Sequence, residues 1–151
     1  MISYLDTTDL LCINLEHVGD NKLLGRVHNL NSLKYLEEIV RDDGCFPNLY
    51  EKAAVYCFNI ITRHVFIDGN KRTGMTAALW FLALNDVCIT HLSDDEIIDT
   101  ALLIANSKTT LDELVAILWG WEDKEKGKDI IKSLDHIITQ YAVAWAKLSK
   151  L

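Results

Sequence analysis

Apolar residues recur at helical spacing along most of the chain, and polar residues between them mark where helices begin and end. Residues three or four positions apart share one face of a helix, so this period predicts buried helical faces. Serine, threonine or asparagine followed three residues later by glutamate is typical of a helix start, and glycine is typical of a helix end. The pattern predicts an all-α fold with helices that begin near residues 7, 32, 48, 70, 93, 110 and 130.

The two helices that begin near Asn48 and Asn70 are predicted to be central. Both carry apolar residues on more than one face, and such a helix must be surrounded by other elements. The segment that joins them, residues 64–70, therefore lies close to the core. Residues 20–31 lack helical periodicity and are interpreted either as a surface connector or as a loop that positions a substrate.

The last part of the chain is predicted to be a charged connector over residues 122–128, followed by one long amphipathic helix. Its apolar stripe runs from Ile130 to Leu148, with charged and polar residues opposite. The stripe packs either on the protein's own core or on a second copy or partner, because a stripe this wide is costly to expose. We divide the chain into residues 1–122 and residues 123–151, the second part holding the rest of this connector and the terminal helix.

The composition is that of an ordinary globular domain: 151 residues, 50% hydrophobic and 25% charged, with one proline and seven glycines. A net charge of -7 is the wrong sign for holding a phosphate backbone, so no direct nucleic-acid partner is expected. The longest apolar run, Ala77 to Leu84, is far shorter than the roughly 20 residues of a membrane span. No secretory signal pattern opens the chain, and the expected location is cytoplasmic.

Most histidines and cysteines show no pattern of chemical interest. The four cysteines form no Cys-x-x-Cys pair or Cys/His cluster, so neither a zinc site nor a redox pair is expected. Four of the five histidines lack neighbours at metal-ligand spacing and are interpreted as surface or packing residues: His17, His28, His91 and His136.

Residues 64–74 gather polar side chains between the two helices that are predicted to be buried. Gly69 allows a tight bend, and the helix that begins near Asn70 presents free N–H groups and the positive end of its dipole. Such a helix start binds anions. Lys71 adds a point charge and Arg72 a planar fork suited to phosphate oxygens. The segment is therefore predicted to bind the phosphates of a nucleotide.

Three further residues complete this prediction. Asp68 is a candidate ligand for Mg²⁺ that bridges phosphate oxygens. His64 is a candidate general base, because an imidazole exchanges protons near neutral pH and can take one from an attacking hydroxyl. Phe66, apolar between polar neighbours, is expected to anchor the loop in the core.

Each of these residues also has a structural interpretation. A histidine near a helix end often caps it, aspartate before glycine is common in turns, and asparagine often caps helices. Lysine and arginine on an emerging helix commonly face solvent. The combination favours a functional site, although short motifs need their structural context.

The motif His-x-Phe-x-Asp-Gly-Asn-Lys-Arg-Thr resembles the signature of the Fic superfamily, His-x-Phe-x-(Asp/Glu)-Gly-Asn-Gly-Arg-x-x-Arg. Lys71 stands where that signature has its second glycine, and Met75 where it has its second arginine. Both departures are typical of the death-on-curing (Doc) branch. The resemblance covers about residues 7–121, so residues 122–151 extend beyond a typical Doc protein.

The resemblance implies a helical bundle of the Fic/Doc type, with or without a short β-flap, plus an extra C-terminal helix. It implies a toxin of a type II toxin–antitoxin system whose partner is a cognate antitoxin. Doc proteins are kinases that transfer the terminal phosphate of ATP, with Mg²⁺, to a threonine of elongation factor Tu and so arrest translation. In that scheme His64 is the base, Asp68 the metal ligand, and Gly69 and residues 70–72 hold the phosphates.

Several alternatives stay open at this stage. The runner-up function is a Fic-type transferase that attaches AMP or another nucleotide to a hydroxyl, and a third is a non-catalytic binding module. The resemblance places residues 22–31 as the flap that pairs with the target chain. It also predicts inhibition by a separate antitoxin, because no inhibitory Ser/Thr-x-x-x-Glu-Gly/Asn motif is present; the nearest match, Thr109 to Glu113, is followed by leucine.

Overall fold

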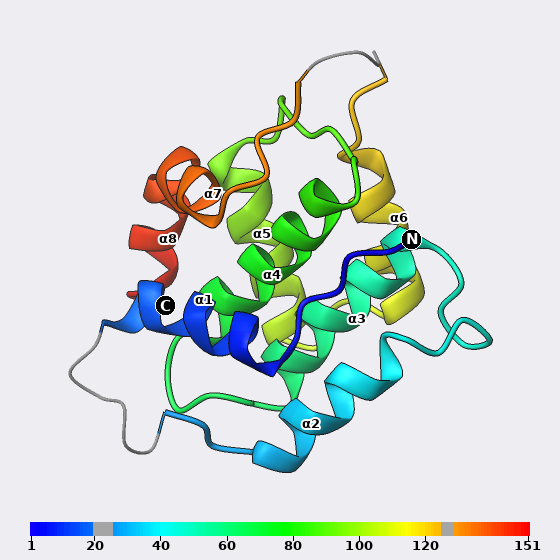
Figure 1. The fold of residues 1–151 in the computed structure, drawn as a ribbon. Coiled ribbons are helices and arrows are strands. Elements are labelled where there is room, and N and C mark those ends of the chain that lie inside the picture. Colours follow the sequence, from blue (N-terminus) through cyan, green and yellow to red (C-terminus); the bar gives the residue numbers. More distant parts are fainter. Residues whose placement is uncertain (20–25, 125–128) are drawn as a thin grey trace.

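The computed structural model describes residues 1–19, 26–124 and 129–151, and within these ranges the chain is all-α (Figure 1). The described residues contain an isolated β-bridge but no sheet. In the described ranges no helix is both long and apolar enough to cross a bilayer. The helices are α1 (Thr7–Val18), α2 (Leu30–Ile39), α3 (Leu49–Thr62), α4 (Asn70–Leu84), α5 (Asp94–Ala105), α6 (Leu111–Gly120), α7 (Leu134–Gln140) and α8 (Ala142–Leu148).

Helices α3 and α4 form the centre of the fold, as their apolar faces predict (Figure 1). All residues from Lys52 to Cys57 are buried, and α4 is buried from Thr73 to Leu79. The two helices approach closely at Gly74, where a Cβ atom would lie 2.9 Å from Cγ1 of Ile61. Since α3 and α4 pack along each other, the segment between them is held at one end of the core.

Local capping side chains begin most of the helices. Asp6, Asn29, Asn48, Ser93, Thr110 and Ser133 each accept a hydrogen bond from a backbone N–H of the first turn, and they cap α1, α2, α3, α5, α6 and α7. Helix α2 begins two residues earlier than predicted. The reason is that Oδ1 of Asn29 accepts the Ser32 N–H at 3.0 Å, so Asn29 is the cap.

The prediction of one long terminal helix is wrong, because the chain forms α7 and α8 with a break at Tyr141 (φ -110°, ψ 30°). In a continuous helix the Ala144 N–H would donate to the carbonyl of Gln140. It donates instead to Oδ1 of Asp94, at the start of α5, at 2.9 Å. A tertiary hydrogen bond has replaced one inside the helix.

The apolar stripe of the terminal segment packs on the protein's own core. Helix α8 contacts α5, and both α7 and α8 contact α4 (Figure 1). Tyr141, Trp145 and Leu148 are buried. Of the two interpretations of the stripe, the structure shows packing within one chain. Ile131 departs from the pattern: it precedes α7 and is 56% exposed.

The start of the predicted charged connector is fixed by polar contacts, and its residues 125–128 lie outside the described residues. The Asp123 N–H donates to the carbonyl of Cys88 at 2.8 Å, and the Thr90 N–H donates to Oδ1 of Asp123 at 3.0 Å. The hydroxyl of Tyr50 donates to Glu122. This end of the connector therefore belongs to the packed fold.

Of the predicted flap, residues 22–25 lie outside the described residues and residues 30–31 belong to α2. Residues 26–29 run antiparallel to residues 65–67, with a single bridge between Val27 and Phe66. The Ile67 N–H donates to the Arg26 carbonyl at 2.9 Å, and the His28 N–H donates to the Val65 carbonyl at 2.8 Å. The segment before α2 is therefore tied to the loop that joins α3 and α4.

Candidate active site

The start of α4 differs from the starts of α1, α2, α3, α5, α6 and α7 because its cap residue, Gly69, has no side chain to satisfy the first-turn amides. Gly69 has φ +80°, and a Cβ atom there would lie 2.8 Å from Cγ2 of Val18. Both the left-handed backbone and the contact with α1 require glycine. Among the described residues no side-chain cap engages the first-turn N–H groups, an arrangement that suits an anion.

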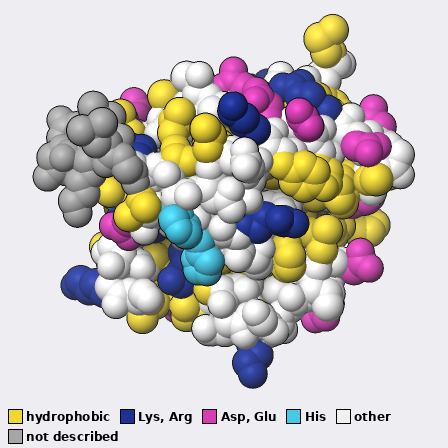
Figure 2. Space-filling view, turned by 90° about the horizontal axis from the view of Figure 1, so that it is seen from below, with side chains coloured by type: hydrophobic (Ala, Val, Ile, Leu, Met, Phe, Trp, Pro, Cys, Tyr) yellow, Lys and Arg dark blue, Asp and Glu magenta, His cyan; other side chains and the backbone are white. Residues whose placement is uncertain are grey.

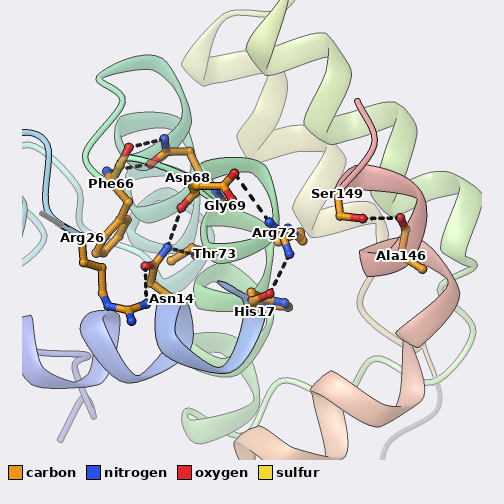
Figure 3. Close-up of polar contacts among 11 residues, drawn as sticks. Asn14, His17, Arg26, Phe66, Asp68, Gly69, Arg72, Thr73, Ala146 and Ser149 are labelled. Atoms are coloured by element: carbon orange, nitrogen blue, oxygen red, sulfur yellow. Dashed lines mark hydrogen bonds and ion pairs between the residues drawn. The ribbon is translucent and has the colours of Figure 1, made fainter. Parts of the chain in front are cut away.

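The turn before α4 is held by Asn14, a buried residue of α1 that is 1% exposed. Its Nδ2 donates to the carbonyl of Asp68 at 2.8 Å and to Oγ1 of Thr73 at 3.2 Å (Figure 3). Its Oδ1 accepts from Nη1 of Arg26 at 3.1 Å, and Nη2 of Arg26 donates to the carbonyl of Gly19 at 2.9 Å. The bonds from Nδ2 of Asn14 fasten α1 to the turn, and Arg26 holds the Asn14 side chain and the end of α1.

Asn70 uses its side chain to shape the loop. Its Oδ1 accepts the Phe66 N–H at 2.9 Å, and its Nδ2 donates to the Phe66 carbonyl at 2.8 Å. Phe66 itself is 1% exposed, so its ring is an anchor in the core. With both side-chain groups engaged, Asn70 has its backbone N–H to offer to a phosphate, in line with the predicted role of free N–H groups at this helix start.

Arg72 reaches back toward the end of α1. Its Nη1 donates to the carbonyl of His17 at 2.7 Å, and its Nη2 lies 3.7 Å from Oδ1 of Asp68 (Figure 3). The Arg72 side chain is 11% exposed, whereas that of Asp68 is 62% exposed. The guanidinium is therefore fixed by a backbone acceptor while its carboxylate neighbour stays open to solvent.

His17 lies beside the guanidinium of Arg72, and two contacts of its imidazole ring hold it in place. Its Nε2 hydrogen-bonds with Oγ1 of Thr76 at 2.7 Å, and its ring meets the ring of Trp145 edge-on at 5.1 Å. Burial lowers the pKa of His17 to about 4, and the positive charge of Arg72 adds to this shift. His17 is therefore neutral at physiological pH. The interpretation of His17 as a packing residue fits its position.

The candidate base, His64, is exposed and follows the end of α3. Its backbone has φ +48°, a left-handed conformation that is uncommon for a residue with a side chain. Nδ1–H of His28 donates to the carbonyl of His64 at 3.0 Å. Histidine side chains are visible together on the face of the molecule seen from below (Figure 2). The backbone contacts leave the imidazole of His64 at the surface.

Two more motif residues complete the site. Oδ1 of Asp68 accepts the Gly69 N–H at 2.8 Å, and Lys71 is half-buried in the first turn of α4. Asp68 and residues 69–72 therefore lie together at the α4 start, with His64 at the other end of the same short loop. The arrangement offers backbone amides, two cations, a carboxylate and an exposed imidazole. These are the kinds of group that catalyse phosphoryl or nucleotidyl transfer.

Sequence analysis missed Asn14, Arg26 and His17, which fasten this loop from outside the motif. Asn14 could have been noticed, because it follows Leu10 and Ile13 at helical spacing on the buried face of α1. A polar residue on a buried face needs hydrogen-bond partners. No comparable signal marks Arg26, which lies in the segment without periodicity.

Comparison with known proteins decides the family. A sequence model described as the Fic/DOC family matches residues 22–82. The chain is 36% identical over 127 residues to Toxin Doc of Mycolicibacterium smegmatis, an alignment that covers 80% of this chain and 95% of the relative. The chain belongs to the Doc branch of the Fic/Doc family. The matched region contains the whole loop from His64 to Arg72 and most of α4.

Within the Fic/Doc family, this chain departs from the wider Fic signature at Lys71 and Met75, and the structure shows where both residues lie. Lys71, in place of glycine, puts a cation in the first turn of α4. Met75, in place of the second arginine, is fully buried in the core. At that position α4 therefore offers a ligand no charge.

Proposed function

We propose that this Fic/Doc protein is a toxin that transfers the terminal phosphate of ATP to a threonine hydroxyl of elongation factor Tu. The observation that carries the proposal is the start of α4, where Gly69 leaves the first-turn amides uncapped between Asp68 and the cations Lys71 and Arg72. A helix start with added cations is suited to a polyphosphate. The exposure of His64, at the beginning of the same loop, supports its role as the base for an acceptor that approaches from solvent.

The chemical step is a displacement at phosphorus. The acceptor oxygen forms a bond to the terminal phosphorus while the bond from that phosphorus to the bridging oxygen breaks, and ADP leaves. The proton of the acceptor hydroxyl passes to the imidazole of His64. The amides of the α4 start, with Lys71 and Arg72, stabilise the negative charge of the phosphoryl oxygens, which supplies most of the acceleration in reactions of this kind.

The residues present also fit a magnesium ion. Asp68 is a largely exposed carboxylate, and Mg²⁺ is usually held by one or two carboxylates together with substrate phosphates. Among the described residues no group of three or more histidine, cysteine, aspartate or glutamate side chains could hold a metal. The phosphates of a bound nucleotide would supply the further ligands. When bound, Mg²⁺ would neutralise charge on the phosphates.

Lys71 and Met75 favour transfer of the terminal phosphate over transfer of a nucleotide. A lysine side chain in the first turn takes up room that glycine leaves for one phosphate group. Burial of Met75 removes the anchor that a second arginine would give to the far end of the triphosphate. Together these residues favour ATP bound with its terminal phosphate toward the acceptor, as the resemblance implies for Doc proteins.

The proposed partners are a cognate antitoxin and elongation factor Tu. The name Toxin Doc, printed for the Mycolicibacterium smegmatis relative, supports a toxin that needs an antitoxin to restrain it. The bridge between Val27 and Phe66 brings the chain segment before α2 beside the motif loop, where a target chain can reach both.

The deciding experiment compares ATP labelled on the terminal phosphate with ATP labelled on the first phosphate. Each is incubated with the full chain, Mg²⁺ and elongation factor Tu, with His64→Ala as the control. Terminal label on elongation factor Tu, absent with His64→Ala, is the expected result. First-phosphate label on the acceptor would instead show a Fic-type nucleotidyl transferase. No label from either position would favour a different acceptor protein or the non-catalytic binding module.

A second experiment tests inhibition by a separate antitoxin. The chain expressed alone is expected to arrest growth, and His64→Ala is expected to abolish the arrest. A full-length chain that is folded but inactive, and that becomes active when residues 129–151 are removed, would contradict the proposal.

A further inference from the structure

Helix α8, which lies far from the motif in sequence, borders the active-site arginine in space. A cleft of about 280 Å³ is lined by Glu16, His17 and Arg72 on one side. Its other side is formed by α7 and α8 with the residue that follows α8, through Ile138, Ala142, Trp145, Ala146 and Ser149. Figure 3 shows α8 and Ser149 facing the side of α4 that carries Arg72. The terminal segment thus lies where it can influence that side chain.

A continuous chain of contacts joins α8 to the guanidinium. The ring of Trp145 meets the ring of His17 edge-on, with centroids 5.1 Å apart and planes at 67°. Nε2 of the same imidazole hydrogen-bonds with Oγ1 of Thr76 in α4 at 2.7 Å. The carbonyl of the same His17 receives Nη1 of Arg72 at 2.7 Å. Whatever fixes His17 also fixes the acceptor that orients Arg72.

Trp145 is itself held firmly enough to act as a support. It is 5% exposed, and its Nε1 donates to the carbonyl of Ile137 at 3.4 Å. The residue before it, Ala144, is fastened to Asp94 of α5 by the bond that breaks the terminal helix. The position of Trp145 against His17 of α1 therefore depends on the bond between Ala144 and Asp94 of α5.

We propose that Trp145 and His17 are positioning residues for Arg72, so that the C-terminal helix α8 maintains the phosphate-binding geometry of the active site. The proposal rests on the proposed function, because it assumes that Arg72 binds phosphate. A guanidinium that is already oriented loses less conformational freedom when a phosphate binds, so nucleotide affinity depends on this support. The neutral state of His17 fits this role, since a cation there would repel Arg72.

The test measures binding of a non-hydrolysable ATP analogue with Mg²⁺ to the full chain by calorimetry. Trp145→Ala is expected to raise the Kd roughly three- to tenfold. The effect is moderate because Arg72 loses its fixed orientation but is still present to contact the nucleotide. Trp145→Phe, which keeps an aromatic ring, should restore most of the affinity. In turnover assays KM for ATP should rise more than kcat falls.

Leu148→Ala is the matched control, because Leu148 is a buried residue of α8 that does not line the cleft. It should lower the melting temperature about as much as Trp145→Ala and leave the Kd unchanged. An equal loss of affinity in Leu148→Ala would show that general loosening of α8 is responsible, and would overturn the proposal.

A double-mutant cycle with Arg72→Ala shows whether the effect passes through Arg72. If it does, Trp145→Ala and His17→Ala each weaken nucleotide binding in the wild-type background and add nothing in the Arg72→Ala background. The same loss in both backgrounds would overturn the proposal. An increase in affinity or activity in Trp145→Ala would also overturn it, because α8 would then be an inhibitory cover.

A measurement without nucleotide separates this proposal from the proposed function. The Nε–H of Arg72 can be followed by NMR, and Trp145→Ala should make it more mobile while Leu148→Ala should not. If the wild-type chain binds no nucleotide, the proposed function fails, and this signal alone decides whether α8 orients Arg72. An unchanged signal in Trp145→Ala would refute the positioning role.

Discussion

The starts of α4 and α5 solve the same physical problem in opposite ways. At α5, Oγ of Ser93 accepts the Glu96 N–H at 3.2 Å, and the Glu96 carboxylate accepts the Ser93 N–H at 3.0 Å. At α4, Gly69 has no side chain, and the turn is held by residues more than 50 positions away in the sequence. A local cap closes a helix start, whereas distant supports hold it in place and leave its amides open.

Of these two helix starts, only the start of α4 is suited to binding and stabilising a reacting group. The amides of a capped first turn are engaged by their own neighbours, so they have less to offer to a ligand. The α4 start is rigid because Asn14 and His17 of α1 fasten the residues on either side of it. Rigid and unoccupied donors are what electrostatic stabilisation requires.

The largest expected effect is loss of transfer activity when His64 is replaced. Because His64 has φ +48°, His64→Asn is the best substitution: asparagine tolerates this backbone but cannot act as the base. Activity should fall roughly 100- to 10,000-fold, as when a general base is removed. The melting temperature should change little. Full activity in His64→Asn would show that His64 is not the general base.

The second prediction compares two glycines. Gly69→Ala places a Cβ 2.8 Å from Val18 at φ +80°, so it should lower the free energy of unfolding by about 1–3 kcal/mol. It should also weaken nucleotide binding. Gly120→Ala is the control, since no heavy atom outside its immediate surroundings lies within 4 Å of its Cβ position. Chemical denaturation of both variants is the measurement. Equal stability in the two variants would contradict the need for glycine at α4.

The third prediction concerns the capped helix. Ser93→Ala removes the α5 cap and should lower the free energy of unfolding by about 1 kcal/mol. The affinity for the ATP analogue should not change. Urea denaturation and calorimetry on the same sample measure both quantities. A drop in affinity would show that the starts of α4 and α5 are coupled, and would contradict the prediction.

The last prediction concerns a difference in pH dependence, which is small near neutral pH. The pKa of His17 is lowered to about 4 by burial and by Arg72, while the unfolded chain has the ordinary value near 6.5. The unfolded state therefore binds the proton more readily. The stability that comes from neutral His17 is present above pH 6.5 and is lost as the pH falls toward 4. His17→Gln should unfold with a shallower pH dependence over this range in urea titrations at several pH values.

The elements of this fold that depend on neighbouring residues were predicted well from the sequence. Capping side chains act within four residues, so the starts of α3, α5 and α6 followed from Asn48, Ser93 and Thr110. The central place of α3 and α4 followed from apolar residues on several of their faces. In the candidate site, the motif from His64 to Arg72 is local in the same sense: Asp68 and residues 69–72 lie at the α4 start, with His64 at the other end of the same short loop.

The predictions that were wrong or incomplete depended on contacts between distant residues. One terminal helix was expected because the apolar stripe is continuous, but the break at Tyr141 follows from the bond between Ala144 and Asp94. Arg26 and His17 carry no pattern in the sequence that links them to the motif. Their roles arise from hydrogen bonds across the fold.

The sequence by itself determined most of the helices, the buried pair α3 and α4, and the identity of the residues in the loop between them. Tertiary structure alone decided how those residues are used. Asn70 shapes the loop, Arg72 is oriented by the end of α1, and Trp145 supports that end from α8. The physical reason is range: helical periodicity and caps act within a few residues, whereas the orientation of a side chain depends on whichever distant atoms the fold brings beside it.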